Sequence, residues 1–267
     1  MSEHHIRLGD GRLTGFSAIG DPVGGRLVVL CHATPGAAGF DPDPPVTVSS
    51  GAHIVALDRP GYGSSDPVGD GATFSPAQWA DEVAEFLKRT EETADSISPA
   101  DLHNVGVIGW REGGLFAAAL ASRHPELVDR VAFVGSPTPP RLAAAADTDP
   151  ADWLDVSRFA THRDDTEAYA YTRRIERMLA DATLSGTAGI ANDLAAFREA
   201  GIDFSAITSE NLYVYGMRDD IATVRDANWF AENLPNTVAY RSDTGGRDLI
   251  WVEWQRILDH VVPRKDQ

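Results

Sequence analysis

Two arginines stand in glycine-rich turns, where a side chain can meet a ligand. Arg111 lies in the segment Gly109-Trp110-Arg111-Glu112-Gly113-Gly114, and Arg247 directly follows Gly245-Gly246. A guanidinium group is always protonated and carries five donors and no acceptor, so it can neither attack a carbonyl carbon nor take up a proton. Its paired donors suit a carboxylate or a phosphate. Lysine accounts for only two of the 23 Lys and Arg residues, so arginine is common in this chain. The presence of an arginine at one position does not by itself indicate a function.

The elements that must position these turns follow an α/β pattern. Short apolar runs alternate with helical patterns, which predicts a mostly parallel central sheet flanked by helices. A helix is expected to open at Glu112 and run to His124, directly after the strand that leads into Arg111. The central strands are expected at 27–31, 53–57, 105–108, 131–134 and 212–215.

Two further helices are predicted to cover the sheet. One begins after Ser75, with Pro76 in the first turn and Gln78 closing a capping box. Apolar spacing then predicts which side chains these two helices bury. They are Trp79, Val83, Phe86 and Leu87 in the first helix, and Ile250, Trp254, Ile257, Leu258 and Val261 in the last one.

The segment 137–208 contains no strand pattern. Its apolar residues, such as Tyr171, Ile175 and Met178, follow helical spacing, which predicts a helical insertion between two strands. We therefore expect a core formed by 1–136 and 209–267, with a helical cap insertion at 137–208. The cap would lie over the C-terminal edge of the sheet, where open α/β sheets bind ligands.

Three motifs carry a family resemblance. His32-Ala33-Thr34-Pro35-Gly36 is similar to the His-Gly-x-Pro-Gly oxyanion loop of α/β-hydrolases, and the segment from Asp58 to Ser65 resembles their D-x-P-G-x-G-x-S loop. The turn from Gly109 to Gly114 resembles the nucleophile elbow, a strained strand-to-helix turn that needs small neighbours. With the strand order, these motifs cover nearly the whole chain and imply an α/β-hydrolase fold with a helical cap.

The resemblance also shows what is missing. The family's nucleophilic serine falls on Arg111 and its histidine on Arg247, while the turn that carries the acid places that role at Asp219, with Asp220 as the neighbouring alternative. A degenerate triad of Arg111, Asp219 and Arg247 excludes ordinary Ser-His-Asp hydrolysis. An enzyme whose triad is removed accelerates the reaction only about 10³- to 10⁴-fold over the rate in water, through binding and oxyanion stabilisation.

The same resemblance assigns an oxyanion hole and a pocket. Backbone N–H groups of Thr34 and Glu112 would form the hole, and His32 lies near it, where a loop-stabilising hydrogen bond is favoured over proton transfer. Arg111 and Arg247 would both point into the pocket, where guanidiniums about 6 Å apart repel by roughly 2–3 kcal/mol at an effective dielectric near 20. We expect Asp219 to pair with Arg247, and Glu112 or an acid of the insertion to hold Arg111.

Three functions are consistent with these residues. The first is a non-hydrolytic small-molecule enzyme, such as a lyase, isomerase or cyclase, that binds an acidic substrate bearing a carboxylate or phosphate. The second is a catalytically silent binding or regulatory protein, whose arginines plug the pocket through salt bridges. The third is a hydrolase in which Asp219 or His32 activates water. An open cavity beside Arg111 would favour ligand binding there, and a filled one would favour the plug.

Composition limits the partners. A net charge of −17 disfavours nucleic acid and anionic membrane surfaces, and no apolar run approaches the roughly 20 residues of a membrane span. The N-terminus lacks an apolar signal core, so a cytoplasmic location is expected. Cys31 is the single cysteine and ends a predicted buried strand, which favours core packing over a nucleophilic role. Neither a metal site nor a cofactor is predicted, and homo-oligomers are left open.

Overall fold

The computed structural model describes residues 4–22, 26–69, 72–93, 104–160, 166–198 and 201–263. In these residues eight strands form one sheet, in the order β1-β2-β4-β3-β5-β6-β7-β8. β2 runs antiparallel to both of its neighbours, and the adjacent pairs from β4 to β8 are parallel. The strands are β1 (His4–Arg7), β2 (Leu13–Gly20), β3 (Arg26–Cys31), β4 (Ala52–Leu57), β5 (Val105–Trp110), β6 (Val128–Val134), β7 (Glu210–Gly216) and β8 (Thr237–Ser242).

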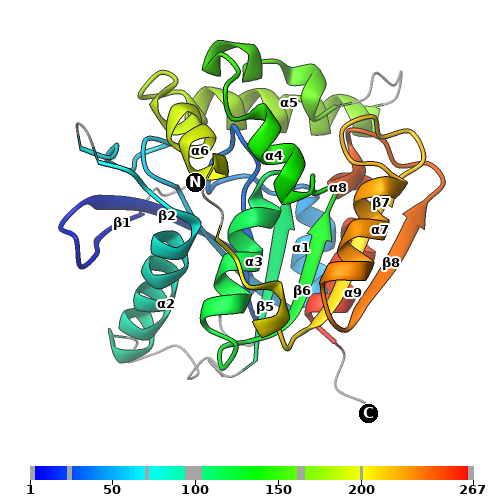
Figure 1. The fold of residues 1–267 in the computed structure, drawn as a ribbon, viewed down its shortest axis with the longest axis horizontal. Coiled ribbons are helices and arrows are strands. Elements are labelled where there is room, and N and C mark those ends of the chain that lie inside the picture. The colour runs from blue at the N-terminus through cyan, green and yellow to red at the C-terminus, as the bar shows by residue number, and fades with distance from the viewer. Residues whose placement is uncertain are drawn as a thin grey trace.

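Helices cover both faces of this sheet (Figure 1). α2 (Pro76–Thr93) packs against α3 (Gly113–Arg123) on one face, and α1 (Pro44–Ser50) packs against α9 (Trp254–Val261) on the other. α7 (Val224–Asn233) packs on β7 and β8, and the short α8 (Leu249–Val252) leads into α9.

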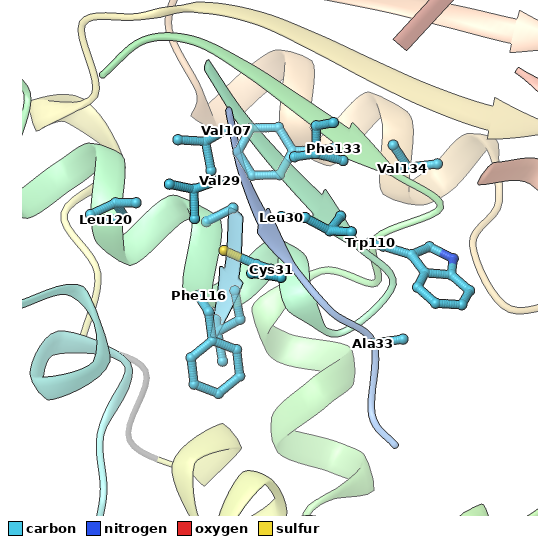
Figure 2. Packing of buried hydrophobic residues seen from close by; sticks show 14 of the residues in the cluster. Val29, Leu30, Cys31, Ala33, Val107, Trp110, Phe116, Leu120, Phe133 and Val134 are labelled. Carbon is cyan, nitrogen blue, oxygen red and sulfur yellow. The ribbon is translucent and has the colours of Figure 1, made fainter. Parts of the chain in front are cut away.

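The core lies on both sides of the central strands, as a covered parallel sheet requires. Every residue of β5 is buried, and β3 is buried from Leu27 to Cys31. Figure 2 shows Cys31 among apolar side chains that include Val29, Phe116 and Leu120. Cys31 has no exposed surface, and burial raises the pKa of its thiol to about 12. Core packing is therefore its role, as predicted.

The five predicted central strands are all present. The capping box is confirmed, because the Ser75 amide donates to Gln78 Oε1 at 2.8 Å and the Gln78 amide donates to Ser75 Oγ at 3.2 Å. The predicted apolar faces of α2 and of the last helix are buried, although the latter breaks at Glu253 into α8 and α9. The sequence patterns did not reveal β1, β2 or β8.

The segment between β6 and β7, called the insertion below, contains helices and no strand among its described residues. That it forms a cap separate from the core stays a prediction. Figure 1 shows α4, α5 and α6 across the end of the sheet toward which the parallel strands point. The limits at 137 and 208 stay a prediction. The elements are α4 (Pro139–Ala145), η1 (Pro150–Trp153), η2 (Val156–Arg158), α5 (Thr166–Ala182), α6 (Ala188–Arg198) and η3 (Phe204–Ala206).

Candidate functional site

Arg111 occupies a tight turn between β5 and α3. Its φ is 54°, a left-handed conformation that costs energy for a residue with a side chain. The turn depends on glycine, because a Cβ on Gly109 would come within 2.6 Å of Gly114 Cα, and one on Gly113 within 2.1 Å of the Cys31 carbonyl oxygen. The strained elbow geometry is thus present, with an arginine at its centre.

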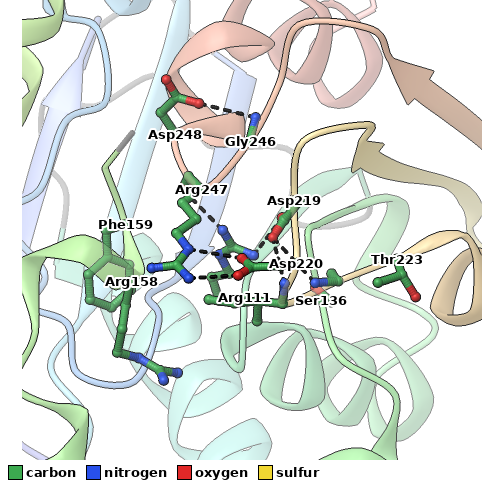
Figure 3. Close-up of polar contacts among 12 residues, drawn as sticks. Arg111, Ser136, Arg158, Phe159, Asp219, Asp220, Thr223, Gly246, Arg247 and Asp248 are labelled. Carbon is green, nitrogen blue, oxygen red and sulfur yellow. Dashed lines mark hydrogen bonds and ion pairs between the residues drawn. The ribbon is translucent and has the colours of Figure 1, made fainter. Parts of the chain in front are cut away.

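The side chain of Arg111 forms a buried ion pair with Asp219 (Figure 3). Arg111 Nη1 donates to Asp219 Oδ2 at 2.6 Å, and the two side chains are 1% and 0% exposed. Arg111 Nη2 donates to the carbonyl oxygen of Arg247 at 3.1 Å. Gly135 leaves room for the pair, since a Cβ there would lie 3.2 Å from Arg111 Nη1. Asp219 Oδ1 accepts from the Ile221 amide at 2.9 Å, so both of its oxygens are engaged.

The predicted ion pair between Asp219 and Arg247 is wrong. Arg247 turns outward, where its Nε and Nη2 donate to the two oxygens of Asp220 at 2.9 and 2.7 Å. Its Nη1 donates to the carbonyl oxygen of Ser157 in the insertion at 2.8 Å. The hydrogen bonds from Arg247 lower the pKa of the partly exposed Asp220 carboxyl group. The physical reason is reach: Arg111 is long enough to meet Asp219 directly, which leaves Arg247 to the neighbouring acid.

The carboxylate of Glu112 lies against the predicted oxyanion loop. Its Oε2 accepts from the Thr34 amide at 3.2 Å, and its Oε1 accepts from Arg158 Nη2 of the insertion at 3.0 Å. The Glu112 side chain is 2% exposed. The expectation that Glu112 holds Arg111 is therefore wrong, because Glu112 pairs with Arg158. The Thr34 N–H group, predicted to serve an oxyanion, already has an acceptor.

His32 stabilises its loop, as favoured from the sequence. Its Nδ1 lies 2.8 Å from the Ala33 carbonyl oxygen, and its Nε2 accepts from the Arg59 amide at 3.3 Å. Burial, together with the nearby Arg59 charge, lowers the pKa of His32 well below its usual value. The ring is therefore neutral, with its proton on Nδ1, and it is committed to backbone partners.

A second buried ion pair fastens α6 of the insertion to this loop. Arg59 is 0% exposed and donates from Nε and Nη2 to the two oxygens of Asp193 at 2.9 and 2.6 Å. Asp193 Oδ2 also accepts from Thr34 Oγ1 at 2.6 Å and from the Tyr62 hydroxyl at 2.8 Å. A Cβ on Gly189 would come within 2.7 Å of the Tyr62 ring, so helix and loop are in close contact. The insertion is thereby held against the core by charge and by shape.

Aromatic rings fill the space beside the elbow. Trp110, which precedes Arg111, stacks on Phe40 at 4.8 Å between ring centroids and contacts Phe159 of the insertion at 5.2 Å. The Tyr171 hydroxyl donates to the Phe159 carbonyl oxygen at 3.0 Å. Because these four aromatic residues are at most 3% exposed, the site is packed like a protein core.

The pairing of Asp193, Arg158 and Asp220 was not predicted from the sequence. A signal for Asp193 was present, because it lies beside Leu194 on a helix that also buries Ile190 and Phe197. A carboxylate among apolar positions needs a buried cation. No comparable signal marks Arg158.

Neither a metal cluster nor a membrane span emerges from the described residues. They contain no group of three or more His, Cys, Asp or Glu side chains placed to hold a metal ion. None of the helices in the described ranges has both the length and the apolar character needed to cross a membrane.

The fold and the elbow define a class of protein that the family comparison makes explicit. Residues 26–245 match the family model described as alpha/beta hydrolase fold, so the chain belongs to that family. A curated relative, 2-hydroxy-6-oxononadienedioate/2-hydroxy-6-oxononatrienedioate hydrolase 1 of Pseudomonas putida, is 24% identical over 94% of this chain and 90% of its own. A pimeloyl-[acyl-carrier protein] methyl ester esterase of Chromobacterium violaceum is 29% identical, over 70% of this chain and 73% of its own.

Solved structures agree on the fold. An esterase from Exiguobacterium antarcticum superimposes with a TM-score of 0.71 at 18% identity, over 96% of each chain. The enol-lactonase from Burkholderia xenovorans LB400 gives a TM-score of 0.70 at 16% identity, over 95% of this chain and 96% of its own. At these identities the likeness concerns the fold alone.

Proposed function

We propose that this chain is a catalytically silent member of the α/β-hydrolase family that binds a ligand or partner and does not transform it. The observation that carries the proposal is the enclosed pair of Arg111 and Asp219, at 2.6 Å. One arginine fills the space that the nucleophile and the base need, and its charge is neutralised by the residue in the acid's position. Such a pair leaves no group there that can attack a carbonyl or accept a proton.

Glu112 supports the same conclusion independently. An oxyanion hole stabilises a transition state only if its donors are free to meet the developing charge. Here the Thr34 amide donates to a carboxylate of the protein itself, and that carboxylate is held by Arg158. An incoming substrate would have to displace an anion that has a second, charged partner.

A non-hydrolytic enzyme that binds an acidic substrate through Arg111 is the weaker candidate. That reaction needs guanidinium donors open to a ligand, whereas Arg111 is 1% exposed. The names of two relatives describe hydrolases of dioates, which are dicarboxylates, so an acidic ligand is consistent with ancestry. We propose that such a ligand is bound without being transformed, at a site other than Arg111.

Water activation by Asp219 or His32 is also disfavoured. Both carboxylate oxygens of Asp219 accept hydrogen bonds, from Arg111 and from the Ile221 amide. The acceptor nitrogen of His32 is bonded to the Arg59 amide. Neither residue keeps the unengaged basic atom that a general base requires.

The experiment is a direct assay of serine-hydrolase chemistry. We expect no hydrolysis of p-nitrophenyl esters above the rate without protein, and no labelling by a fluorophosphonate probe, with an active esterase of the same fold as the positive control. Stoichiometric labelling of a serine would overturn the proposal, because it would reveal a nucleophile elsewhere in the chain.

A further inference from the structure

A cavity of about 300 Å³ lies between α5 of the insertion and the segment that joins β3 to α1. Ile19, Phe40 and Met178 give it apolar walls, and Arg174 and Arg177 line it from α5. These arginines are three positions apart on one helix, so they project from the same side. The cavity therefore combines an apolar body with two cationic groups, as ligand sites for small organic acids do.

Arg174 is a half-buried cation whose donors are only partly engaged. Its Nη2 donates to the Pro42 carbonyl oxygen at 2.7 Å, and it makes no ion pair within the part of the chain that the structure describes. Its Nε is buried and donates to no group among the same residues. Asp41 is a charged neighbour of Arg174, but no carboxylate of the described residues is in ion-pair contact with it. A half-buried guanidinium without such a contact is unusual, because buried donors are nearly always satisfied. The chain has a net charge of −17, so it contains many carboxylates that could have paired with this cation.

Two carboxylates also line the cavity and must be taken into account. Asp41 Oδ1 accepts from the Thr47 hydroxyl at 2.7 Å and from the Asp43 amide at 3.1 Å. Burial raises the pKa of Asp41, although the nearby positive charge of Arg174 acts to lower it. Asp181 lies 4.0 Å from Arg177 Nε, which is too long for a hydrogen bond. None of these contacts occupies a donor of Arg174.

From this arrangement we infer that the cavity binds a small monocarboxylic acid with an apolar body, held by Arg174 and assisted by Arg177. The inference rests on the proposed binding role and names its site. At about 30 Å³ per water molecule, the cavity volume corresponds to roughly ten waters, or an acid of about ten non-hydrogen atoms. The carboxylate would accept from the guanidiniums, and the body would lie on Phe40 and Met178.

The cavity is separate from the buried pair of Arg111 and Asp219, called the silent centre below. Phe40 lines the cavity and also stacks on Trp110, so it stands between the cavity and the elbow. Binding at this place needs no donor from Arg111. The inference thus differs from an anion site at the elbow, which the buried pair of Arg111 and Asp219 disfavours.

The test is isothermal titration calorimetry of the full chain with benzoate, benzamide and inorganic phosphate. We expect benzoate to bind and neither benzamide nor phosphate to match it. Arg174→Met should weaken benzoate binding roughly ten- to hundred-fold, as expected for loss of a charge-assisted contact. The matched control is Arg173→Met, because Arg173 is on the same helix, is 64% exposed and pairs with Glu176. It should change the Kd by less than about two-fold.

A crystal soaked with 4-bromobenzoate locates the ligand directly, and its anomalous bromine signal should lie between Phe40 and Met178. If Arg174→Met does not fold, Arg177→Gln provides the second variant, because Arg177 is 66% exposed. The assignment of the cavity would be overturned by equal weakening in Arg173→Met, by a bromine signal elsewhere, or by phosphate that binds as tightly as benzoate. None of these outcomes would contradict the proposed lack of catalysis. Ester hydrolysis by the protein would overturn the silent centre and leave the cavity standing.

Discussion

Replacing Arg111 by Met should destabilise the fold strongly, because the carboxylate of Asp219 is then enclosed without its cation. Removing one partner of a buried ion pair costs about 3–5 kcal/mol. For 267 residues the entropy of unfolding near 60 °C is roughly 0.56 kcal/mol/K, at about 2.1 cal/mol/K per residue, so the Tm should fall by about 5–9 °C. Calorimetry measures the Tm, and urea titration measures the free energy of unfolding without adding salt.

The double variant Arg111→Met with Asp219→Asn should recover much of this loss. No buried charge remains in it, and the new amide side chain keeps an oxygen that can accept from the Ile221 amide. The two changes are therefore expected to be far from additive.

The ion pair of Arg247 and Asp220 provides a matched control, because it joins the same residue types but is exposed to solvent. Their side chains are 33% and 66% exposed, so Arg247→Met should cost at most about 1 kcal/mol, or roughly 2 °C. The reasoning is refuted if Arg111→Met lowers the Tm by no more than Arg247→Met does. It is also refuted if the double variant loses the sum of the single losses.

Three further outcomes follow from buried groups. Cys31, with a pKa of about 12, is thiolate in roughly one molecule in 10⁴ at pH 8, so maleimide should label it only after unfolding; labelling of the native protein within minutes would contradict this. Burial raises the pKa of Glu82 from 4.5 to about 7 despite Arg12, so the folded state holds this proton more tightly. Stability should therefore fall as the pH rises from about 4.5 to 7, and Glu82→Gln should flatten this part of the Tm profile; a slope equal to that of the parent would exclude the assignment. Asp193→Asn should leave Arg59 without its counter-charge, cost about 3–5 kcal/mol, and speed amide exchange in α6, whereas unchanged exchange would mean that the pair does not hold the insertion.

The fold could be predicted from the sequence to the extent that hydrophobic patterning determines it. Parallel strands buried on both faces produce continuous apolar runs, and these gave the five central strands. β1 and β8 are edge strands with largely exposed side chains, and β2 is interrupted by Gly15 and Ser17, so none of the three forms such a run. The break between α8 and α9 was missed because the apolar spacing continues across Glu253.

The site could be predicted by position but not by pairing. The glycine pattern located the strained turn at Arg111, and the later turn located Asp219. Which arginine meets which acid depends on side-chain reach, and Asp219 and Asp220 are adjacent in the sequence although one faces inward and the other outward. The carboxylate of Glu112 at the Thr34 amide depends on Arg158, which is 46 residues away in the chain. Motifs do not encode contacts of this kind.

The ion pair between Arg111 and Asp219 also bears on how such a protein can evolve. If the proposed function holds, a working triad would need a serine at 111, a histidine at 247 and a residue at 112 that frees the Thr34 amide. The first of these changes alone would strand the charge of Asp219 and lower stability before any activity appeared. Changing Arg247 first would give a histidine with no nucleophile to serve. Because each single change is costly or without benefit to selection, point mutation would not readily convert this site into a working triad.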